Sequence, residues 1–278
     1  MRAVVLAGGL GTRIGRPEKC LLSVGGVPLL FRVVGALMHA GFDQVAVATT
    51  PRHVGVVWLA RLWGLEVLYT SGRGYHHDLV EVAELAPVLA ASCDLADLSP
   101  RHVEQLLGMD VFTSATSGGR FVGLSWIPSR DLDRWAEVEV GPLINVNTWE
   151  DLRKAEEEAP PAYPIPVDPA TLLPHEMTLG VMEGLSEAPI AVDVWTCTVL
   201  DGHHRVEAAA KTGRWVYALL LDYGEVEVNM PKLEVLSRAA SRLPYPPKTT
   251  WHTYRGRHVS QLPYAVGRAR RPLRCRPL

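Results

Sequence analysis

A proline-rich segment divides the chain and limits the folds that are open to it. The segment APPAYPIPVDP, residues 159–169, contains five prolines in eleven residues. Proline fixes φ and lacks a backbone N–H, so such a run continues neither a helix nor a central strand and acts as a semi-rigid spacer. At 278 residues the chain is also long for one compact domain. We therefore predict two domains, 1–158 and 170–278, joined by a linker over 159–169.

The first half alternates short apolar runs with longer amphipathic runs. This rhythm predicts strands and helices in turn, with strands over 3–7, 43–49 and 65–69 and helices over 28–41, 56–64 and 148–158. Thr148 is the expected N-cap of the last helix. Strand–helix–strand order favours a sheet of parallel strands flanked by helices. The first domain should therefore be a Rossmann-like α/β domain with a mostly parallel sheet.

A glycine-rich loop follows the first expected strand, in the segment LAGGLGTRIGRPEKCLL over residues 6–22. Its glycines permit positive φ and, without a Cβ, let backbone N–H groups approach a phosphate. Arg13 and Lys19 add the positive charge that a triphosphate requires. The spacing matches neither the dinucleotide-binding loop nor the P-loop. The predicted members of this nucleotide site are Leu6, Ala7, Gly8, Gly9, Gly11, Thr12, Arg13 and Lys19.

Asp94 is the candidate metal ligand of the first domain. It lies in AASCDL, residues 90–95, directly after an apolar run. A carboxylate at a strand end suits Mg²⁺, which accompanies nucleoside triphosphates, although Asp94 could instead serve as a helix N-cap. The expected chemistry is attack of an acceptor phosphate on the α-phosphate of a nucleoside triphosphate, with loss of pyrophosphate. Such a protein mainly positions and neutralises its substrates.

Four motifs within residues 1–157 resemble those of the archaeal GTP:adenosylcobinamide-phosphate guanylyltransferases, in the MobA-like group of nucleotidyltransferases. In the order of that family they are the glycine-rich loop, TSGRGYHHDL (70–79), AASCDL (90–95) and INVNTWEDLRKAE (144–156). The resemblance implies that GTP is the nucleotide and adenosylcobinamide phosphate the acceptor. Where the family carries Gly-Ile-Asn, this chain has GLSW at 123–126.

The same resemblance assigns further residues to the nucleotide. It implies that Gly72, Gly74 and Asp78 hold the guanine nucleotide, and that Asn145 and Asn147 lie near the site. We expect His76 and His77, in the same segment, to be solvent-facing loop residues. A molybdopterin or sugar-phosphate nucleotidyltransferase is the alternative within this class of enzyme.

The second half is predicted to be a smaller α+β domain centred on DGHHR, residues 201–205. Residues 190–200 alternate and are rich in β-branched side chains, which predicts a strand, and 206–213 contain strong helix formers before a glycine. DGHHR thus lies at a strand-to-helix turn, where free N–H groups and the helix dipole favour an anion. A metal site on both histidines and a purely structural role are the alternatives, although adjacent side chains diverge.

Two further segments could complete a site around DGHHR. LLPHE (172–176) supplies the carboxylate of Glu176, which could otherwise be an ordinary exposed helix residue. YPPKTTWH (245–252) could be a simple surface loop, but its side chains suit phosphate oxygens. The candidates in it are Lys248, Thr249, Thr250 and His252.

Together, PHE, DGHHR, LLLDYGEVEV (219–228) and PKTTWH resemble, in order, the archaeal free L-serine kinases with a ParB/sulfiredoxin-like fold. The resemblance implies a phosphate donor, ADP or ATP, with Glu176 as general base and Asp201 supporting the site through Mg²⁺ or the substrate hydroxyl. The phosphate-binding residues that it implies are Gly202, His203, His204, Arg205, Lys248, Thr249, Thr250 and His252. The segment between DGHHR and PKTT is shorter than in those kinases.

The two resemblances suggest one pathway, because the nucleotide loop of a cobamide is attached through aminopropanol phosphate, which derives from L-threonine phosphate. We therefore hypothesise a bifunctional cobamide-biosynthesis enzyme: a guanylyltransferase joined to an L-threonine or L-serine kinase. The alternatives are a nucleotidyltransferase for another phosphorylated acceptor fused to an L-serine kinase, or a ParB-like nucleotide-binding regulator. Support for the regulator comes from residues 255–278, which hold seven arginines and no acid, although a solvated basic tail fits them equally.

Charge and cysteine content bound the partners and the compartment. A formal net charge of −2 predicts neither nucleic-acid nor membrane binding. No long apolar run and no signal-peptide pattern is present, so we expect no membrane span. The cysteines at 20, 93, 197 and 275 form no Cys-x-x-Cys pair, which argues against a zinc ribbon or a disulfide scaffold and favours the cytoplasm. The expected partners are small-molecule substrates, with a homodimer as the candidate assembly.

Overall fold

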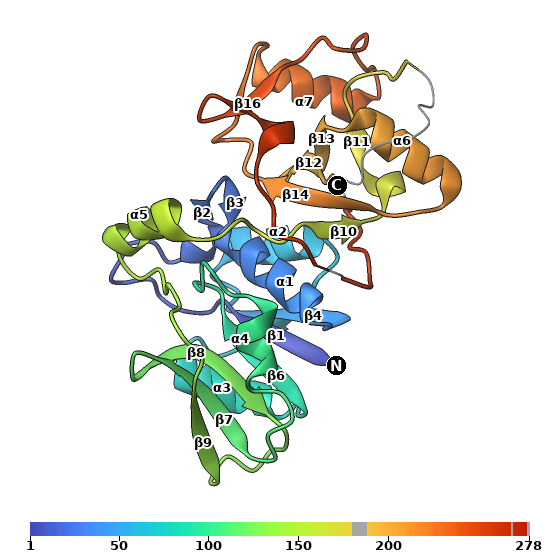
Figure 1. Ribbon diagram of the computed structural model, residues 1–278. Helices are drawn as coiled ribbons and strands as arrows, with labels where there is room; N and C mark the ends of the chain where they lie inside the picture. The colour runs from blue at the N-terminus through green and yellow to red at the C-terminus, as the bar shows by residue number, and fades with distance from the viewer. Residues whose placement is uncertain (180–187, 268, 277–278) are drawn as a thin grey trace. The chain divides into compact units, whose positions relative to one another are not determined.

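The computed structural model describes residues 1–179, 188–267 and 269–276, and it divides into two compact units (Figure 1). The first unit holds Met1–Arg61, Leu65–Ala162 and Gly267–Arg270, and the second holds Leu62–Gly64, Tyr163–Val266 and Arg271–Leu278. The main division thus falls between Ala162 and Tyr163, inside the proline-rich segment. Among the described residues, no helix is both long and apolar enough to cross a membrane.

A seven-stranded sheet forms the centre of the first unit, in the order β5-β4-β1-β6-β8-β7-β9 (Figure 1). Its strands are β1 (Arg2–Leu6), β4 (Gln44–Thr49), β5 (Glu66–Tyr69), β6 (Val88–Ser92), β7 (Phe112–Ser117), β8 (Arg120–Ile127) and β9 (Trp135–Glu139). In the described part of this sheet, β8 alone runs against its neighbours. The sheet is therefore mostly parallel, as predicted, although the sequence patterns did not predict β7, β8 or β9.

Helices cover both faces of this sheet. They are α1 (Leu29–His39), α2 (Val54–Leu62), α3 (Tyr75–Ala83), α4 (Pro100–Glu104) and α5 (Trp149–Glu158). Val4 and Leu6 of β1 share an apolar cluster with Leu79 and Val82 of α3. The intervening residues of β1 are equally buried, because Val5 is 0% exposed on the opposite face. This double coverage matches the continuous apolar character of the first strand.

Local signals at two helices explain where they begin. Thr148 caps α5, as predicted, because its hydroxyl accepts from the backbone N–H of Asp151 while Asp151 accepts from that of Thr148. The loop predicted for His76 and His77 is instead the first turn of α3, although both residues are exposed there. A short 3₁₀ turn, η1 (Lys19–Leu21), and a small hairpin, β2 (Ser23–Val24) with β3 (Val27–Pro28), connect the glycine-rich loop to α1.

The second unit combines a five-stranded mixed sheet, in the order β10-β14-β12-β13-β11, with a small three-stranded sheet. Its elements are β10 (Ile165–Val167), η2 (Pro169–Thr171), β11 (Leu173–Pro174), β12 (Ile190–Asp193), β13 (Thr198–Asp201), α6 (His203–Thr212), β14 (Val216–Leu221), β15 (Glu227–Val228), α7 (Lys232–Ser241), β16 (His252–Tyr254), β17 (Arg257–His258) and η3 (Val259–Gln261). This mixture of strands and helices agrees with an α+β domain; a ParB/sulfiredoxin-like fold stays a prediction.

Two predicted segments of the second half differ from the structure. Residues 165–167 are not linker, because they form β10, and Pro166 is tolerated there since β10 is an edge strand. Residues 190–200 are two strands rather than one, because the Asp193 carboxylate accepts from the N–H of Trp195 and the hydroxyl of Thr196 and so makes a turn between them. The helix after DGHHR begins at His203 and ends, as expected, at a glycine, Gly213, in the left-handed conformation.

The cysteine spacing predicted no disulfides, and this prediction was wrong. The structure pairs all four cysteines in two disulfides, Cys20–Cys93 in the first unit and Cys197–Cys275 in the second. The partners are 73 and 78 residues apart in sequence, and the fold brings their Cα atoms to 5.6 and 6.2 Å. The spacing of cysteines reveals only pairs that are close in sequence, so it could not reveal these two disulfides.

Candidate active site

The glycine-rich loop leaves the carboxyl end of β1 and turns back at Gly11. Gly11 has φ of +58°, and a Cβ there would lie 1.8 Å from the carbonyl oxygen of Arg16. The backbone N–H of Arg16 donates to the Gly11 carbonyl at 3.1 Å, which closes the turn. Only glycine fits this position, and the closed turn carries the chain into η1, where Lys19 lies.

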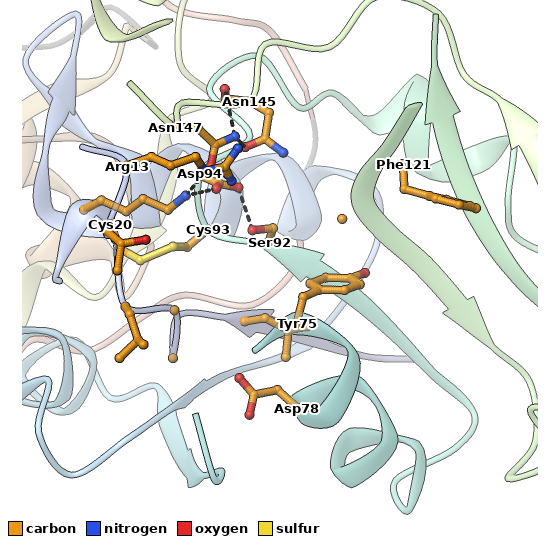
Figure 2. Close-up of a pocket in the computed structure, with 18 residues that line it drawn as sticks. Arg13, Cys20, Tyr75, Asp78, Ser92, Cys93, Asp94, Phe121, Asn145 and Asn147 are labelled. Atoms are coloured by element: carbon orange, nitrogen blue, oxygen red, sulfur yellow. Dashed lines mark hydrogen bonds and ion pairs between the residues drawn. A yellow bond between two sulfur atoms is a disulfide. The ribbon is translucent and has the colours of Figure 1, made fainter. Parts of the chain in front are cut away.

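A pocket lies where β1 and β6, which are adjacent and parallel, both end (Figure 2). Ligands of open α/β sheets bind at this edge, where the loops after the strands converge. Most of the nucleotide and metal residues predicted for the first domain line the pocket, namely Leu6, Gly8, Gly9, Gly11, Thr12, Arg13, Lys19, Asp78, Asp94, Asn145 and Asn147. Ala7, Gly72 and Gly74 do not line it. Ala7 is buried behind it, where its N–H donates to Ala48 at 2.7 Å.

Lys19 is the centre of a charged cluster in this pocket. Its ammonium donates to the Asp94 carboxylate, to Asn147 Oδ1 at 3.0 Å and to the Val146 carbonyl at 3.3 Å. Arg13 donates to the same Asn147 Oδ1 at 2.6 Å, as Figure 2 shows. Two cations from the glycine-rich loop therefore share one acceptor, Asn147 Oδ1, from the far end of the domain. A triphosphate could replace these acceptors, because its oxygens offer more charge than an amide oxygen.

Asp94 is held on both carboxylate oxygens. Ser92 donates to Oδ1 at 2.5 Å and Lys19 donates to Oδ2. The side chains of Lys19 and Asp94 are only 13% and 5% exposed, so each charge depends on its partner. An oxygen donor at the edge of a phosphate site fits Mg²⁺, which binds through one or two carboxylates and substrate phosphates. Asp94 could hold the ion once Lys19 turns to the phosphates. No cluster of three or more His, Cys, Asp or Glu residues suited to a metal occurs among the described residues.

Asp78 fixes a second loop against the glycine-rich loop. Its Oδ1 accepts from the N–H of Gly72 at 3.0 Å, and its Oδ2 would lie 3.0 Å from a Cβ on Gly8. Burial raises the pKa of Asp78 above its ordinary value. Gly72 itself has φ of +63° and approaches Thr50 so closely that no side chain fits. Asp78 and Gly72 thus shape the wall of the pocket beside Gly8.

The asparagines lie where the chain enters α5. Asn147 precedes the N-cap residue Thr148, and its side-chain Nδ2 donates to Asn145 Oδ1 at 2.9 Å. The Asn147 N–H donates to Asp151 at 3.0 Å. The capped start of α5 therefore orients Asn147 Oδ1 toward Arg13 and Lys19.

Sequence reasoning missed several pocket residues, namely Leu10, Cys20, Tyr75, Ser92, Cys93, Phe121 and Gly123. Cys20 and Cys93 adjoin Lys19 and Asp94 in sequence, so their proximity in space was the overlooked signal. Phe121 and Gly123 belong to β8, which the patterns did not predict; the alternation in RFVGLSWI (120–127) was available. Tyr75 donates to or accepts from Ser125 at 3.1 Å.

The sequence of the first unit is similar to that of a known protein family. Residues 3–139 match the family profile of the MobA-like NTP transferase domain. The matched range lies almost entirely within the first unit. The match covers just under half of the chain, and residues 140–278 lie outside it.

Two curated relatives and one solved structure are similar to parts of the chain. An adenosylcobinamide-phosphate guanylyltransferase from Methanocaldococcus jannaschii is 30% identical over 115 residues, 38% of this chain and 58% of that protein. A bifunctional IPC transferase and DIPP synthase from Thermococcus kodakarensis is 44% identical over 52 residues, 19% of this chain and 12% of that protein. The chain thus spans less than two thirds of either relative. A nucleotidyl transferase from Methanothermobacter has TM-score 0.46 and 20% identity, covering 56% of this chain and 95% of that one.

The second unit brings Glu176 and the PKTT loop together. Glu176 Oε1 accepts from the N–H and the hydroxyl of Thr250 at 2.5 and 2.6 Å, and Oε2 accepts from the N–H of Lys248 at 3.2 Å. Backbone pairing sets this position, because Tyr245 donates to the His175 carbonyl and accepts from the N–H of Met177. Thr249 turns away and donates to the Pro246 carbonyl at 2.7 Å.

PHE, DGHHR and PKTTWH meet at His175, which is fully buried. Its Nε2 lies 2.8 Å from the Thr250 hydroxyl, and its ring contacts those of His203 and His252 at centroid distances of 4.7 and 5.3 Å. Burial lowers the pKa of all three histidines, that of His252 to about 3, so the cluster is neutral at pH 7. His252 is only 1% exposed and contacts the Tyr223 hydroxyl, which corrects the prediction that it contacts phosphate directly.

DGHHR forms a strand-to-helix turn, as predicted. Gly202 is the N-cap of α6 with φ of +92°, and a Cβ on it would clash with Ile190. Arg205 donates to Asp201 at 2.7 Å and to the carbonyls of Ala188 and Pro189. These contacts tie Arg205 to the start of the helix. The phosphate roles of Gly202, Arg205 and the half-buried His204 stay predictions, as does the support of the site by Asp201 through Mg²⁺ or the substrate hydroxyl.

Proposed function

We propose that the first unit transfers GMP from GTP to the phosphate of adenosylcobinamide phosphate. The observation that carries the proposal is the convergence of Arg13 and Lys19 on Asp94 and Asn147 in one pocket at the strand ends. The MobA-like match supports a nucleoside triphosphate as substrate, and the relative from Methanocaldococcus jannaschii supports the acceptor and the base.

The pocket supplies what this transfer needs. An oxygen of the acceptor phosphate attacks the α-phosphorus of GTP, and the bond to the departing pyrophosphate breaks. Arg13 and Lys19 neutralise the charge that gathers on the phosphates, and Asn147 keeps the two cations in place. Mg²⁺ bound at Asp94 would add a further positive charge beside the phosphates. Through these contacts the protein orients the phosphates and neutralises their negative charge.

The direct test incubates the purified chain with GTP, Mg²⁺ and one acceptor at a time, and measures pyrophosphate and the capped product. Adenosylcobinamide phosphate, a molybdopterin-type phosphate and a sugar 1-phosphate cover the candidate classes. We expect product with the first acceptor and with GTP rather than CTP. Transfer to the sugar phosphate or to the molybdopterin-type acceptor alone would replace the cobinamide assignment.

For the second unit we infer a free amino-acid kinase, because the PKTT loop holds the Glu176 carboxylate and DGHHR contacts the neighbouring His175. Glu176 is the proposed base that accepts the proton of the L-threonine or L-serine hydroxyl. The hydroxyl oxygen then attacks the terminal phosphorus of ADP or ATP, and the bond to the departing AMP or ADP breaks. Lys248 and Thr250, which hold Glu176, are the proposed phosphate contacts. With both activities the chain would be a bifunctional enzyme of cobamide biosynthesis, using Mg²⁺ in each unit.

The kinase proposal is tested by incubating the chain with L-threonine or L-serine and with ADP, ATP or GTP, and detecting the phospho-amino acid. A preference for L-threonine would support the link to cobamides. Absence of product with every donor would overturn the kinase. Salt-dependent DNA binding, with affinity falling steeply as salt rises, would support the ParB-like regulator in its place.

A further inference from the structure

The rim of the first unit's pocket differs in chemistry from its interior. The interior holds Lys19 and Asp94, whose side chains are 13% and 5% exposed. Two apolar side chains that also line the pocket, Leu10 and Phe121, are 60% and 61% exposed. Figure 2 shows Phe121 across the pocket from Arg13 and Cys20. The pocket is therefore polar where the phosphates would lie and apolar at its mouth.

A second aromatic ring extends this apolar rim. Trp135 of β9 is 55% exposed, and its ring contacts that of Phe121 with a centroid distance of 6.3 Å and an interplanar angle of 53°. β9 is the edge strand of the sheet, so the pair forms a surface that begins in the pocket and runs outward. Two large rings left in contact with water, and not used by the core, are characteristic of a binding surface.

The position of the pair favours the acceptor as its occupant rather than the nucleotide. The triphosphate would lie against Arg13 and Lys19, and its α-phosphorus must be reached by the acceptor from the open side. When the phosphate of an acceptor enters the pocket past Phe121, the rest of the acceptor lies against the rings of Phe121 and Trp135. A small and highly polar acceptor would gain little from them, whereas a large flat apolar face would bury both.

We propose that Phe121 and Trp135 bind the body of the acceptor, and that the acceptor is a phosphate ester with a large, flat, apolar face. This inference rests on the proposed nucleotidyl transfer, and it adds two residues that select the acceptor. Adenosylcobinamide phosphate belongs to this class of molecule, and a sugar 1-phosphate does not.

The test measures binding and turnover separately. Calorimetry gives the dissociation constants of adenosylcobinamide phosphate and of GTP, and steady-state assays give the KM of each substrate. Phe121→Ala and Trp135→Ala should each weaken acceptor binding about tenfold, the effect of losing one aromatic anchor, and leave GTP binding within twofold. Trp135→Phe keeps a ring and should restore most of the affinity. Trp215→Ala is the matched control, because Trp215 is 47% exposed in the second unit.

The outcomes separate this inference from the proposed function. Weaker acceptor binding in both alanine variants, at an unchanged melting temperature, supports the aromatic rim even if no GMP is transferred, in which case only the proposed function fails. Unchanged acceptor binding in both variants overturns the rim while leaving the transfer reaction intact. Weakened GTP binding with unchanged acceptor binding also overturns it, because the rings would then hold the nucleotide. A wild-type chain that binds no such acceptor overturns it outright.

Discussion

The two units hold their central carboxylates in different ways. In the first unit, Asp94 is contacted by side chains, the ammonium of Lys19 and the hydroxyl of Ser92. In the second unit, Glu176 is contacted mainly by the backbone N–H groups of Lys248 and Thr250, together with the Thr250 hydroxyl. Side chains can exchange one partner for another by rotating, whereas backbone groups move only with their loop.

This difference has a consequence for each proposed reaction. In the first unit, Lys19 and Arg13 can turn from Asp94 and Asn147 to a triphosphate without any change in the fold. In the second unit, three donors already occupy Glu176, so it can act as a base only through a remaining lone pair or after the 248–250 loop shifts. We therefore expect the activity of the first site to change when a single charge is removed. The activity of the second site should also change when its 248–250 loop or its buried histidines are altered.

The largest expected effect follows from Lys19→Ala. The variant leaves Asp94 buried without its counter-ion and removes a cation from the phosphates, so kcat/KM for GMP transfer should fall about a thousandfold, or ~4 kcal/mol. Lys19→Arg keeps the charge and should recover part of the loss. The control is Lys154→Ala, since the Lys154 side chain is 56% exposed on α5. A Lys19→Ala activity within twofold of wild type would remove Lys19 from the site.

The two disulfides should differ in their effect on catalysis. The Cys20–Cys93 bond joins the residues that follow Lys19 and precede Asp94, so it fixes the spacing of that pair. A Cys20→Ser/Cys93→Ser double variant should lower the free energy of unfolding by ~3 kcal/mol and raise the KM for GTP. In the Cys197→Ser/Cys275→Ser variant we expect a similar loss of stability but an unchanged KM. An equal change in the KM for GTP in both variants would show that the Cys20–Cys93 bond has no specific role in the site. Chemical denaturation and steady-state assays provide the two measurements.

A smaller kinetic effect is expected for Glu176→Gln. The amide oxygen can still accept from Thr250, but the amide nitrogen can accept neither the Lys248 N–H nor the hydroxyl proton. We therefore expect kcat for amino-acid phosphorylation to fall about a hundredfold, with a loss of about 1 kcal/mol in the free energy of unfolding. Glu227→Gln, at an exposed position of β15, is the control. Phosphorylation at wild-type rate in Glu176→Gln would exclude this residue as the base, whatever the activity of the first unit.

Acid should destabilise the second unit through its buried histidines. The pKa of His252 is about 3 in the folded protein, below the ordinary value of 6.5, because burial disfavours the imidazolium. The unfolded chain therefore binds the proton first, so stability is full above pH 6.5 and declines as the pH falls toward 3. Between pH 6.5 and pH 5, protonation of His252 in the unfolded chain lowers the free energy of unfolding by ~2 kcal/mol. Urea unfolding at the two pH values measures the loss, and His252→Phe should reduce it; an identical loss in that variant would contradict the assignment.

Much of the first site could be predicted from sequence, because its signals are local. The glycine-rich loop, the N-cap at Thr148 and the strand end before Asp94 each depend on residues close together in the chain. What could not be predicted depends on distant pairing. The convergence of Lys19 with Asn147, the Cys20–Cys93 bond and the position of Phe121 beside Trp135 all follow from the order of strands in the sheet.

The second unit was harder to predict from sequence, because its site also depends on contacts between residues that are distant in the chain. The motif around DGHHR predicts its turn and helix, because glycine and helix-forming residues act locally. The prediction that residues 190–200 form one strand failed, since one side chain, Asp193, makes the intervening turn. That His252 is buried against Tyr223, rather than open to a ligand, could be learned only from the packing of β16.

We propose that the cluster of Lys19, Arg13 and Asp94 supports nucleotidyl transfer, and GTP labelled at its α-phosphate provides the direct test. With adenosylcobinamide phosphate and Mg²⁺, we predict that the label passes to the acceptor with one pyrophosphate released per product, and that Lys19→Ala slows the transfer about a thousandfold. Label that remains in GTP with every phosphorylated acceptor, or that reaches the acceptor equally well in Lys19→Ala, would contradict the claim.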